Sequence, residues 1–218
     1  MEVNMEIKGL KINFLGDSIT EGVGVSDIET KRYTSVFEAK SGAIVRNYGI
    51  GGTRIARQHK PSANPRHDLV FLDRVEEMDP DADIIVVFGG TNDFGHGDAA
   101  FGCFDDRDEY TFYGAMHSLV LRIMNRYPDA EIVFMTPLHR RTESVPKADS
   151  GRVLSDYVRA IREVTEYYGI PTLDLYATSG IQPAVVGAVD TMTSDGLHPN
   201  DKGAERIANR LLGFLKSL

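Results

Sequence analysis

The stretch DIIVVFGGTND, residues 83 to 93, decides the fold class. It opens with an unbroken apolar run, Ile84 to Phe88, which has the length of one strand. A continuous apolar strand indicates burial on both faces, and a parallel sheet covered by helices provides such burial. Two glycines and the polar residues Thr91, Asn92 and Asp93 follow, as is typical of a turn into a helix. The stretch therefore predicts a central strand of an α/β domain.

Four other apolar runs share this form, because each is followed by Gly, Pro or polar residues and then by helical periodicity. The five predicted strands cover residues 11–16, 43–49, 83–90, 131–137 and 170–175. The predicted helices cover about 30–41, 66–78, 110–127, 150–168 and 200–217. Alternating strands and helices with right-handed crossovers predict a doubly wound α/β sandwich.

Length and charge narrow the class of protein. A chain of 218 residues fits one α/β domain, so we expect a single domain over residues 1–218. The net charge of −8, from 24 basic and 32 acidic residues, disfavours nucleic acid and anionic membranes as partners. The single cysteine, Cys103, cannot form an internal disulfide, and no apolar segment has the length of a signal peptide or membrane span. We therefore expect a cytoplasmic protein with a small polar substrate and leave its oligomeric state open.

Polar turns follow the first three predicted strands. They are GDSIT at 16–20, GIGGT at 49–53 and GGTND at 89–93. Each turn alone is explained by glycine and by helix capping. Ligands of doubly wound sheets bind beyond the carboxyl ends of the strands, where all three turns should meet. Together they predict a site at that edge.

Ser18 in the first turn is the candidate nucleophile of this site. A serine hydroxyl needs a base to remove its proton, and a carboxylate that orients the base helps. The segment TSDGLHPND, residues 193–201, supplies Asp195 and His198 just before the last predicted helix. Read alone, His198 flanks that helix and Asp195 forms an Asx turn. Other histidines compete as the base, namely His59, His67, His96, His117 and His139.

Acyl transfer also needs hydrogen-bond donors that face the developing oxyanion. The candidates are the backbone amides of Ser18 and Gly52 and the side-chain amide of Asn92. The glycines of the second turn also suit a phosphate-binding loop. However, the chain contains neither G-x-G-x-x-G nor G-x-x-x-x-G-K-[ST], which disfavours nucleotide binding.

The ordered motifs GDSIT, NYGIGGT, GGTND and DGLH resemble the SGNH hydrolases, also called the GDSL esterase and lipase family. The resemblance implies that Ser18 is the nucleophile, His198 the base and Asp195 its orienting partner. It also implies an oxyanion hole formed by the Ser18 amide, Gly52 and Asn92. The implied fold is a flavodoxin-like three-layer sandwich, with a five-stranded parallel sheet of order 2-1-3-4-5 and helices on both faces.

Substrate preference should lie in the loops at this edge, which cover residues 93–110, 138–151 and 176–196. They are polar, which favours short acyl groups, such as acetyl, on polar alcohols such as carbohydrates. We expect substrate contacts from the neighbours of the motifs and from the second loop, namely Asp17, Thr53, Phe94 and His139. The other loop aromatics, Phe101, Phe104 and Tyr110, either anchor the first loop or stack on a ligand.

The principal hypothesis is a serine esterase that needs neither metal nor cofactor. A thioesterase or lysophospholipase on the same residues remains open, with an acyl pocket formed by Val185, Val186 and Met192. A metal-dependent hydrolase would use carboxylate and imidazole ligands, from Asp17, Asp93, Asp195 and His198. A domain that binds polar ligands without catalysis is the non-enzymatic alternative.

Overall fold

The computed structural model describes residues 5–147, 150–185 and 189–218. Its centre is one parallel sheet with the strand order β2-β1-β3-β4-β5, which confirms the predicted fold class and order. The strands are β1 (Lys11–Gly16), β2 (Ile44–Gly49), β3 (Ile84–Phe88), β4 (Glu131–Met135) and β5 (Thr172–Leu173). All five residues of β3 are buried, as expected for a strand with helices on both sides.

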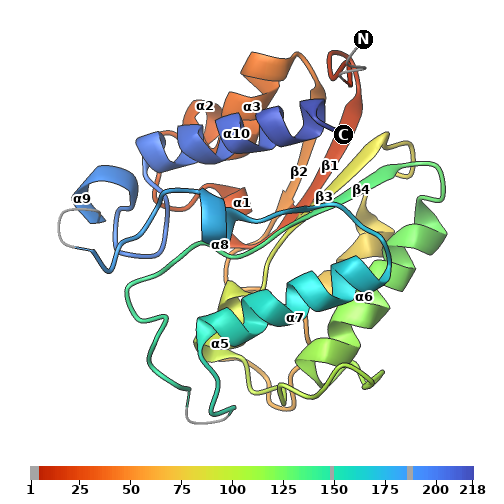
Figure 1. Cartoon of the computed structure of the whole chain (residues 1–218), viewed down its shortest axis with the longest axis vertical. Coiled ribbons are helices and arrows are strands. Elements are labelled where there is room, and N and C mark those ends of the chain that lie inside the picture. Colours follow the sequence, from red (N-terminus) through yellow and green to blue (C-terminus); the bar gives the residue numbers. More distant parts are fainter. Residues whose placement is uncertain (1–4, 148–149, 186–188) are drawn as a thin grey trace.

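Helices cover both faces of the sheet (Figure 1). One layer contains α2 (Ile28–Lys31), α3 (Tyr33–Ser41) and α10 (Asp201–Lys216), and the other contains α4 (Phe71–Arg74), α5 (Thr91–His96), α6 (Phe112–Arg126) and α7 (Leu154–Tyr167). The shorter elements are α1 (Ser18–Glu21), α8 (Leu175–Thr178), α9 (Val189–Met192) and the 3-10 turns η1 (Pro65–Asp68) and η2 (Val75–Glu77). Alternate residues of β3 enter two separate hydrophobic clusters, one beneath each layer.

The structure differs from several predicted elements. The predicted helix over 30–41 is divided at the extended Arg32, and the predicted loop 176–196 contains α9 and most of α8. The predicted helix over 66–78 is broken, because Val70 is extended and the Phe71 amide donates to the Arg54 carbonyl at 3.0 Å. The predicted loop 93–110 begins inside α5. Its Phe101 and Phe104 pack against the core, which favours anchoring of the loop over stacking on a ligand.

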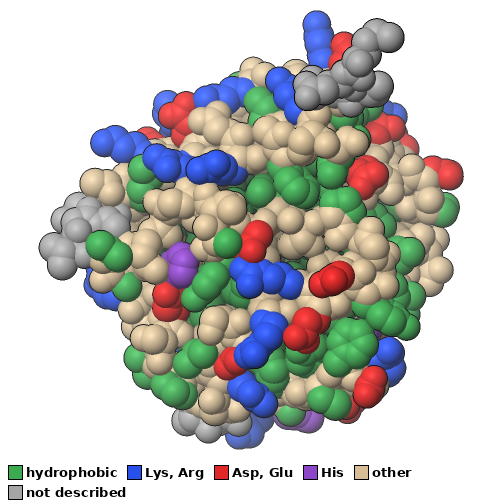
Figure 2. All heavy atoms as spheres, viewed as in Figure 1, with side chains coloured by type: hydrophobic (Ala, Val, Ile, Leu, Met, Phe, Trp, Pro, Cys, Tyr) green, Lys and Arg blue, Asp and Glu red, His purple; other side chains and the backbone are tan. Residues whose placement is uncertain are grey.

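Acidic and basic side chains are interspersed on the face shown in Figure 2. The described residues of that face therefore present mixed charge rather than one extended basic patch. No helix within the described ranges is both long and apolar enough to cross a membrane.

Candidate active site

Ser18 is the first residue of α1, directly beyond the carboxyl end of β1. Gly16 makes the tight turn possible, because a Cβ there would approach Thr20 Cγ2 to 3.0 Å and overlap the rest of that side chain. The Asp17 carboxylate caps the helix by accepting a hydrogen bond of 3.0 Å from the Ile19 amide. The Ser18 side chain is thereby held at the sheet edge, where the residue is 7% exposed.

The Ser18 hydroxyl contacts the His198 ring, and the other side of that ring contacts the Asp195 carboxylate. Ser18 Oγ lies 3.0 Å from His198 Nε2, and His198 Nδ1 lies 2.7 Å from Asp195 Oδ2. Burial alone would raise the pKa of Asp195, but hydrogen bonds from the His198 ring and from the Leu197 and His198 amides hold it below its usual range. The ionised carboxylate fixes the proton of the neutral imidazole on Nδ1, so Nε2 is free to accept a proton from Ser18.

The turn that carries His198 is held at both ends. Before it, the Ser194 amide donates to the His198 carbonyl at 2.9 Å, which closes the turn. After it, Asn200 caps α10 by accepting from the first amides of that helix. Gly24 allows the close approach of the segment that follows α1, because a Cβ at Gly24 would lie 2.8 Å from His198 Cβ. This packing keeps the imidazole in register with the serine.

The three predicted oxyanion donors surround the same edge. The amides of Ser18 and Gly52 donate to no acceptor in the part of the chain that the structure describes, so both are available to a ligand. Asn92, in α5, is 6% exposed and gives one N–H to the Thr53 carbonyl at 3.0 Å. Its second N–H stays available. Such a set of donors is suited to a tetrahedral oxyanion.

Asp93 supports this donor set rather than the chemistry. Its buried carboxylate accepts the amides of Ile55 and Ala56 at 2.9 to 3.1 Å, which ties α5 to the segment that follows Gly52. Asp93 and His96 have the same three-residue spacing as Asp195 and His198. They do not form a second pair, because the Asp93 oxygens are occupied by the backbone.

Two of the other histidines are bonded to groups away from Ser18. His117 is buried between the Tyr168 hydroxyl and the Phe104 carbonyl, and His139 contacts Glu143. Among the described residues, His198 is the histidine whose ring nitrogen reaches the Ser18 hydroxyl.

Three residues that we expected to contact substrate are buried and internally bonded. Asp17 caps α1, and the Thr53 hydroxyl donates to the Ile50 carbonyl at 2.7 Å. Phe94 is 1% exposed and packs in the core against Tyr157. In this structure the three side chains support the site from within, and their contact with substrate stays a prediction.

His139 is partly exposed, and its ring lies 3.8 Å from that of Tyr176. Its contact with substrate stays a prediction.

The residues of the alternative mechanisms are not assembled into their sites. For the acyl pocket, Val185 is 59% exposed, Met192 packs against the core beneath α10, and Val186 lies outside the described residues. For the metal site, one Asp17 oxygen and both Asp93 oxygens accept hydrogen bonds from backbone amides. Within residues 5–147, 150–185 and 189–218, no group of three or more His, Cys, Asp or Glu is placed to hold a metal ion.

Residues 14–206 match the model of the GDSL-like lipase/acylhydrolase family. The chain belongs to this family. A solved structure of a Lactobacillus plantarum protein is 32% identical to this GDSL-family protein, with a TM-score of 0.83 and coverage of 97% of this chain and 98% of that one. A crystal structure of an acetyl xylan esterase is 20% identical, with a TM-score of 0.61 and coverage of 94% of this chain and 98% of that one. At this identity the comparison shows a similar fold.

An acetylxylan esterase from Xylanibacter ruminicola is 22% identical over 223 residues, or 95% of this chain. The GDSL-family protein spans only 43% of the length of that relative.

The sequence pattern does not single out Arg54, although it contacts both sides of the donor set. Its place directly after the GIGGT turn was the available signal. Its partners lie 8 to 42 residues away, at distances that local periodicity does not reveal.

Proposed function

We propose that this protein is a serine esterase in which Ser18 is the nucleophile, His198 the general base and Asp195 its orienting partner. The observation that carries the proposal is the series of contacts from Ser18 Oγ to His198 Nε2 at 3.0 Å and from His198 Nδ1 to Asp195 at 2.7 Å. Membership of the GDSL-like lipase/acylhydrolase family agrees with ester hydrolysis.

The reaction proceeds in two displacements. His198 Nε2 takes the Ser18 proton as Oγ attacks the ester carbonyl, and the oxyanion is stabilised by the Ser18, Gly52 and Asn92 N–H groups. The C–O bond to the alcohol breaks as His198 returns the proton to the leaving oxygen. Water, deprotonated by His198, then attacks the acyl-enzyme, and collapse releases the carboxylic acid and restores Ser18.

The proposed substrate is a short acyl ester, such as an acetyl ester, of a polar alcohol such as a carbohydrate. The loops around Ser18 carry polar groups from Glu21, Arg66, His67 and Arg140 rather than a long apolar surface. The relative named acetylxylan esterase agrees with this class of substrate.

Labelling with a fluorophosphonate probe tests the nucleophile. We expect the wild type and Ser155→Ala, an exposed serine on α7, to label, and Ser18→Ala to remain unlabelled. Equal labelling of Ser18→Ala would refute the assignment. A series of p-nitrophenyl esters from acetyl to palmitoyl tests the acyl group. A fall in kcat/KM beyond butyryl supports the proposal, and a maximum at long chains contradicts it.

A further inference from the structure

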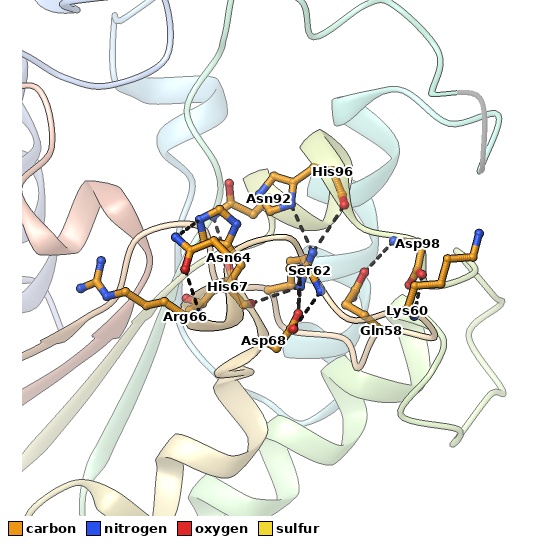
Figure 3. A network of polar contacts seen from close by, with 12 residues as sticks. Gln58, Lys60, Ser62, Asn64, Arg66, His67, Asp68, Asn92, His96 and Asp98 are labelled. Carbon is orange, nitrogen blue, oxygen red and sulfur yellow. Dashed lines mark hydrogen bonds and ion pairs between the residues drawn. The ribbon is translucent and has the colours of Figure 1, made fainter.

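Figure 3 shows a polar network that contains His67, Asp68 and His96 and lies beside Asn92, one of the proposed oxyanion donors. Arg54 joins these three residues through its guanidinium. Arg54 is 3% exposed and follows Gly52 by two residues. Its Nη1 donates to His96 Nδ1 at 3.2 Å, and its Nη2 donates to the His67 carbonyl at 3.2 Å and to Asp68 at 2.6 Å. One guanidinium thus fixes η1 and the last residue of α5 relative to each other.

The two imidazoles of this network flank the donors. A Cβ at Gly52 would lie 2.6 Å from His67 Cγ and closer still to Cδ2 and Nε2, so the His67 ring rests directly on this glycine. His96 is four residues, about one helical turn, after Asn92 in α5. The His67 and His96 rings are 5.4 Å apart and tilted by 40°. They therefore border both Gly52 and Asn92.

His96 presents a neutral N–H donor. A guanidinium has no acceptor, so the contact from Arg54 requires His96 Nδ1 to accept and leaves the proton on Nε2. Burial, and then the positive charge of Arg54 and the neighbouring His67, lower the pKa of His96 to about 4. His96 Nε2 has no partner among the described residues, and although part of the ring is shielded from water, the residue as a whole is exposed to solvent. A ligand oxygen at this position would therefore accept a hydrogen bond from a neutral imidazole N–H group.

Two arginines near the pair are bonded to carboxylates. Arg54 is paired with Asp68 at 2.6 Å, and Arg66 is paired with Glu21 at 2.5 Å. Neither Arg54 nor Arg66 is therefore an uncompensated charge, whereas Arg140, which lies close to Gly95, donates to Thr91 rather than to a carboxylate. Two imidazole rings and one N–H group are better suited to a ligand that has a neutral oxygen acceptor beside a C–H face than to a charged ligand.

We propose that His67 and His96 form a subsite that binds the sugar ring of a neutral O-acylated carbohydrate, with His96 Nε2–H donating to a hydroxyl or ring oxygen. The proposal rests on the esterase function proposed above and names the part of the protein that recognises the alcohol. His67 and His96 are specificity-determining residues in this proposal, and neither takes part in proton transfer.

The test compares one sugar ester with one ester that lacks a sugar. We expect His96→Leu to lower kcat/KM for methyl mono-O-acetyl-xyloside, which keeps free hydroxyls, about tenfold, as for loss of one hydrogen bond. His67→Leu should also lower this kcat/KM, and both variants should change p-nitrophenyl acetate less than about twofold. His96→Gln, which can accept from Arg54 and still donate, should recover most of the activity. The matched control is His59→Leu, an exposed histidine that stacks on Tyr110, and it should leave both substrates unchanged. Equal losses on both substrates, or no loss on either, overturn the subsite.

A binding measurement separates this proposal from the esterase mechanism. In Ser18→Ala protein labelled with ¹⁵N-histidine, we expect the xyloside to shift the His96 Nε2 resonance, and His96→Leu to weaken binding about tenfold. The subsite is refuted if the xyloside does not bind, or binds equally after His96→Leu. Full hydrolytic activity of Ser18→Ala refutes the esterase mechanism instead, and the binding result still decides the subsite.

Discussion

Replacement of Gly52 by alanine should reduce catalysis far more than it reduces stability. Gly52 has φ of +77°, a conformation that costs an L-residue roughly 1–2 kcal/mol. The new Cβ would also overlap the His67 ring, and the His67 carbonyl accepts a hydrogen bond from Arg54. Because this bond holds the His67 backbone in place, we expect relief of the overlap to move the Gly52 amide away from the oxyanion. Loss of one such donor corresponds to a fall of about 10²–10³ in kcat.

Gly169→Ala is the matched control, because Gly169 has φ of +68° and a Cβ there would meet nothing within 4 Å. It should lose about 1–2 kcal/mol of unfolding free energy through backbone strain and keep its kcat. Stability is measured by urea unfolding and activity with p-nitrophenyl acetate. The double variant Gly52→Ala/His67→Ala removes the overlap and should recover part of the lost stability. A Gly52→Ala protein with kcat within threefold of wild type refutes the donor role and the constraint from His67.

Three further predictions test individual residues. Asn92→Ala should lower kcat about 10²–10³ with little change in KM, and a rise in KM alone would assign Asn92 to ground-state binding. Burial raises the pKa of Asp17 to about 6, so the folded protein holds this proton more tightly than the unfolded chain, and stability is lost as the pH rises from about 4 to 6. Relative to wild type, Asp17→Asn should therefore gain up to about 3 kcal/mol between pH 4 and pH 8 in urea unfolding, and an unchanged difference contradicts this. Phe94→Ala should cost about 3–5 kcal/mol of stability, against less than about 1 for the exposed Tyr110→Ala, whereas raised KM at unchanged stability would restore a substrate contact.

The sheet could be predicted because each strand is a short apolar run whose burial depends on its own residues. The run from Ile84 to Phe88 shows this directly, since it is buried on both faces as its composition requires. The break near Val70 could not be predicted, because it depends on a bond between the Phe71 amide and the Arg54 carbonyl, 17 positions apart in the chain. Local periodicity carries no information about such a contact.

The meeting of Ser18 and His198 follows from the same topology. The two residues are 180 positions apart, and their contact arises because a turn after β1 and the turn before α10 lie at one edge of the sheet. Motifs at strand ends therefore identify the residues, and the fold brings them together. The motifs do not reveal which of the residues next to the predicted catalytic residues face the ligand.

The GGTND turn illustrates that limit in adjacent residues. Asn92 presents a free N–H at the site, whereas Asp93 turns to the amides of Ile55 and Ala56 and Phe94 enters the core. Successive residues of a helix point about 100° apart, so adjacency in a motif does not imply a shared role. The same geometry places His96 one turn beyond Asn92, on the side reached by Arg54. The proposed substrate-selecting residues, His67 and His96, are thus found through their contacts with the oxyanion donors and not through the sequence motifs.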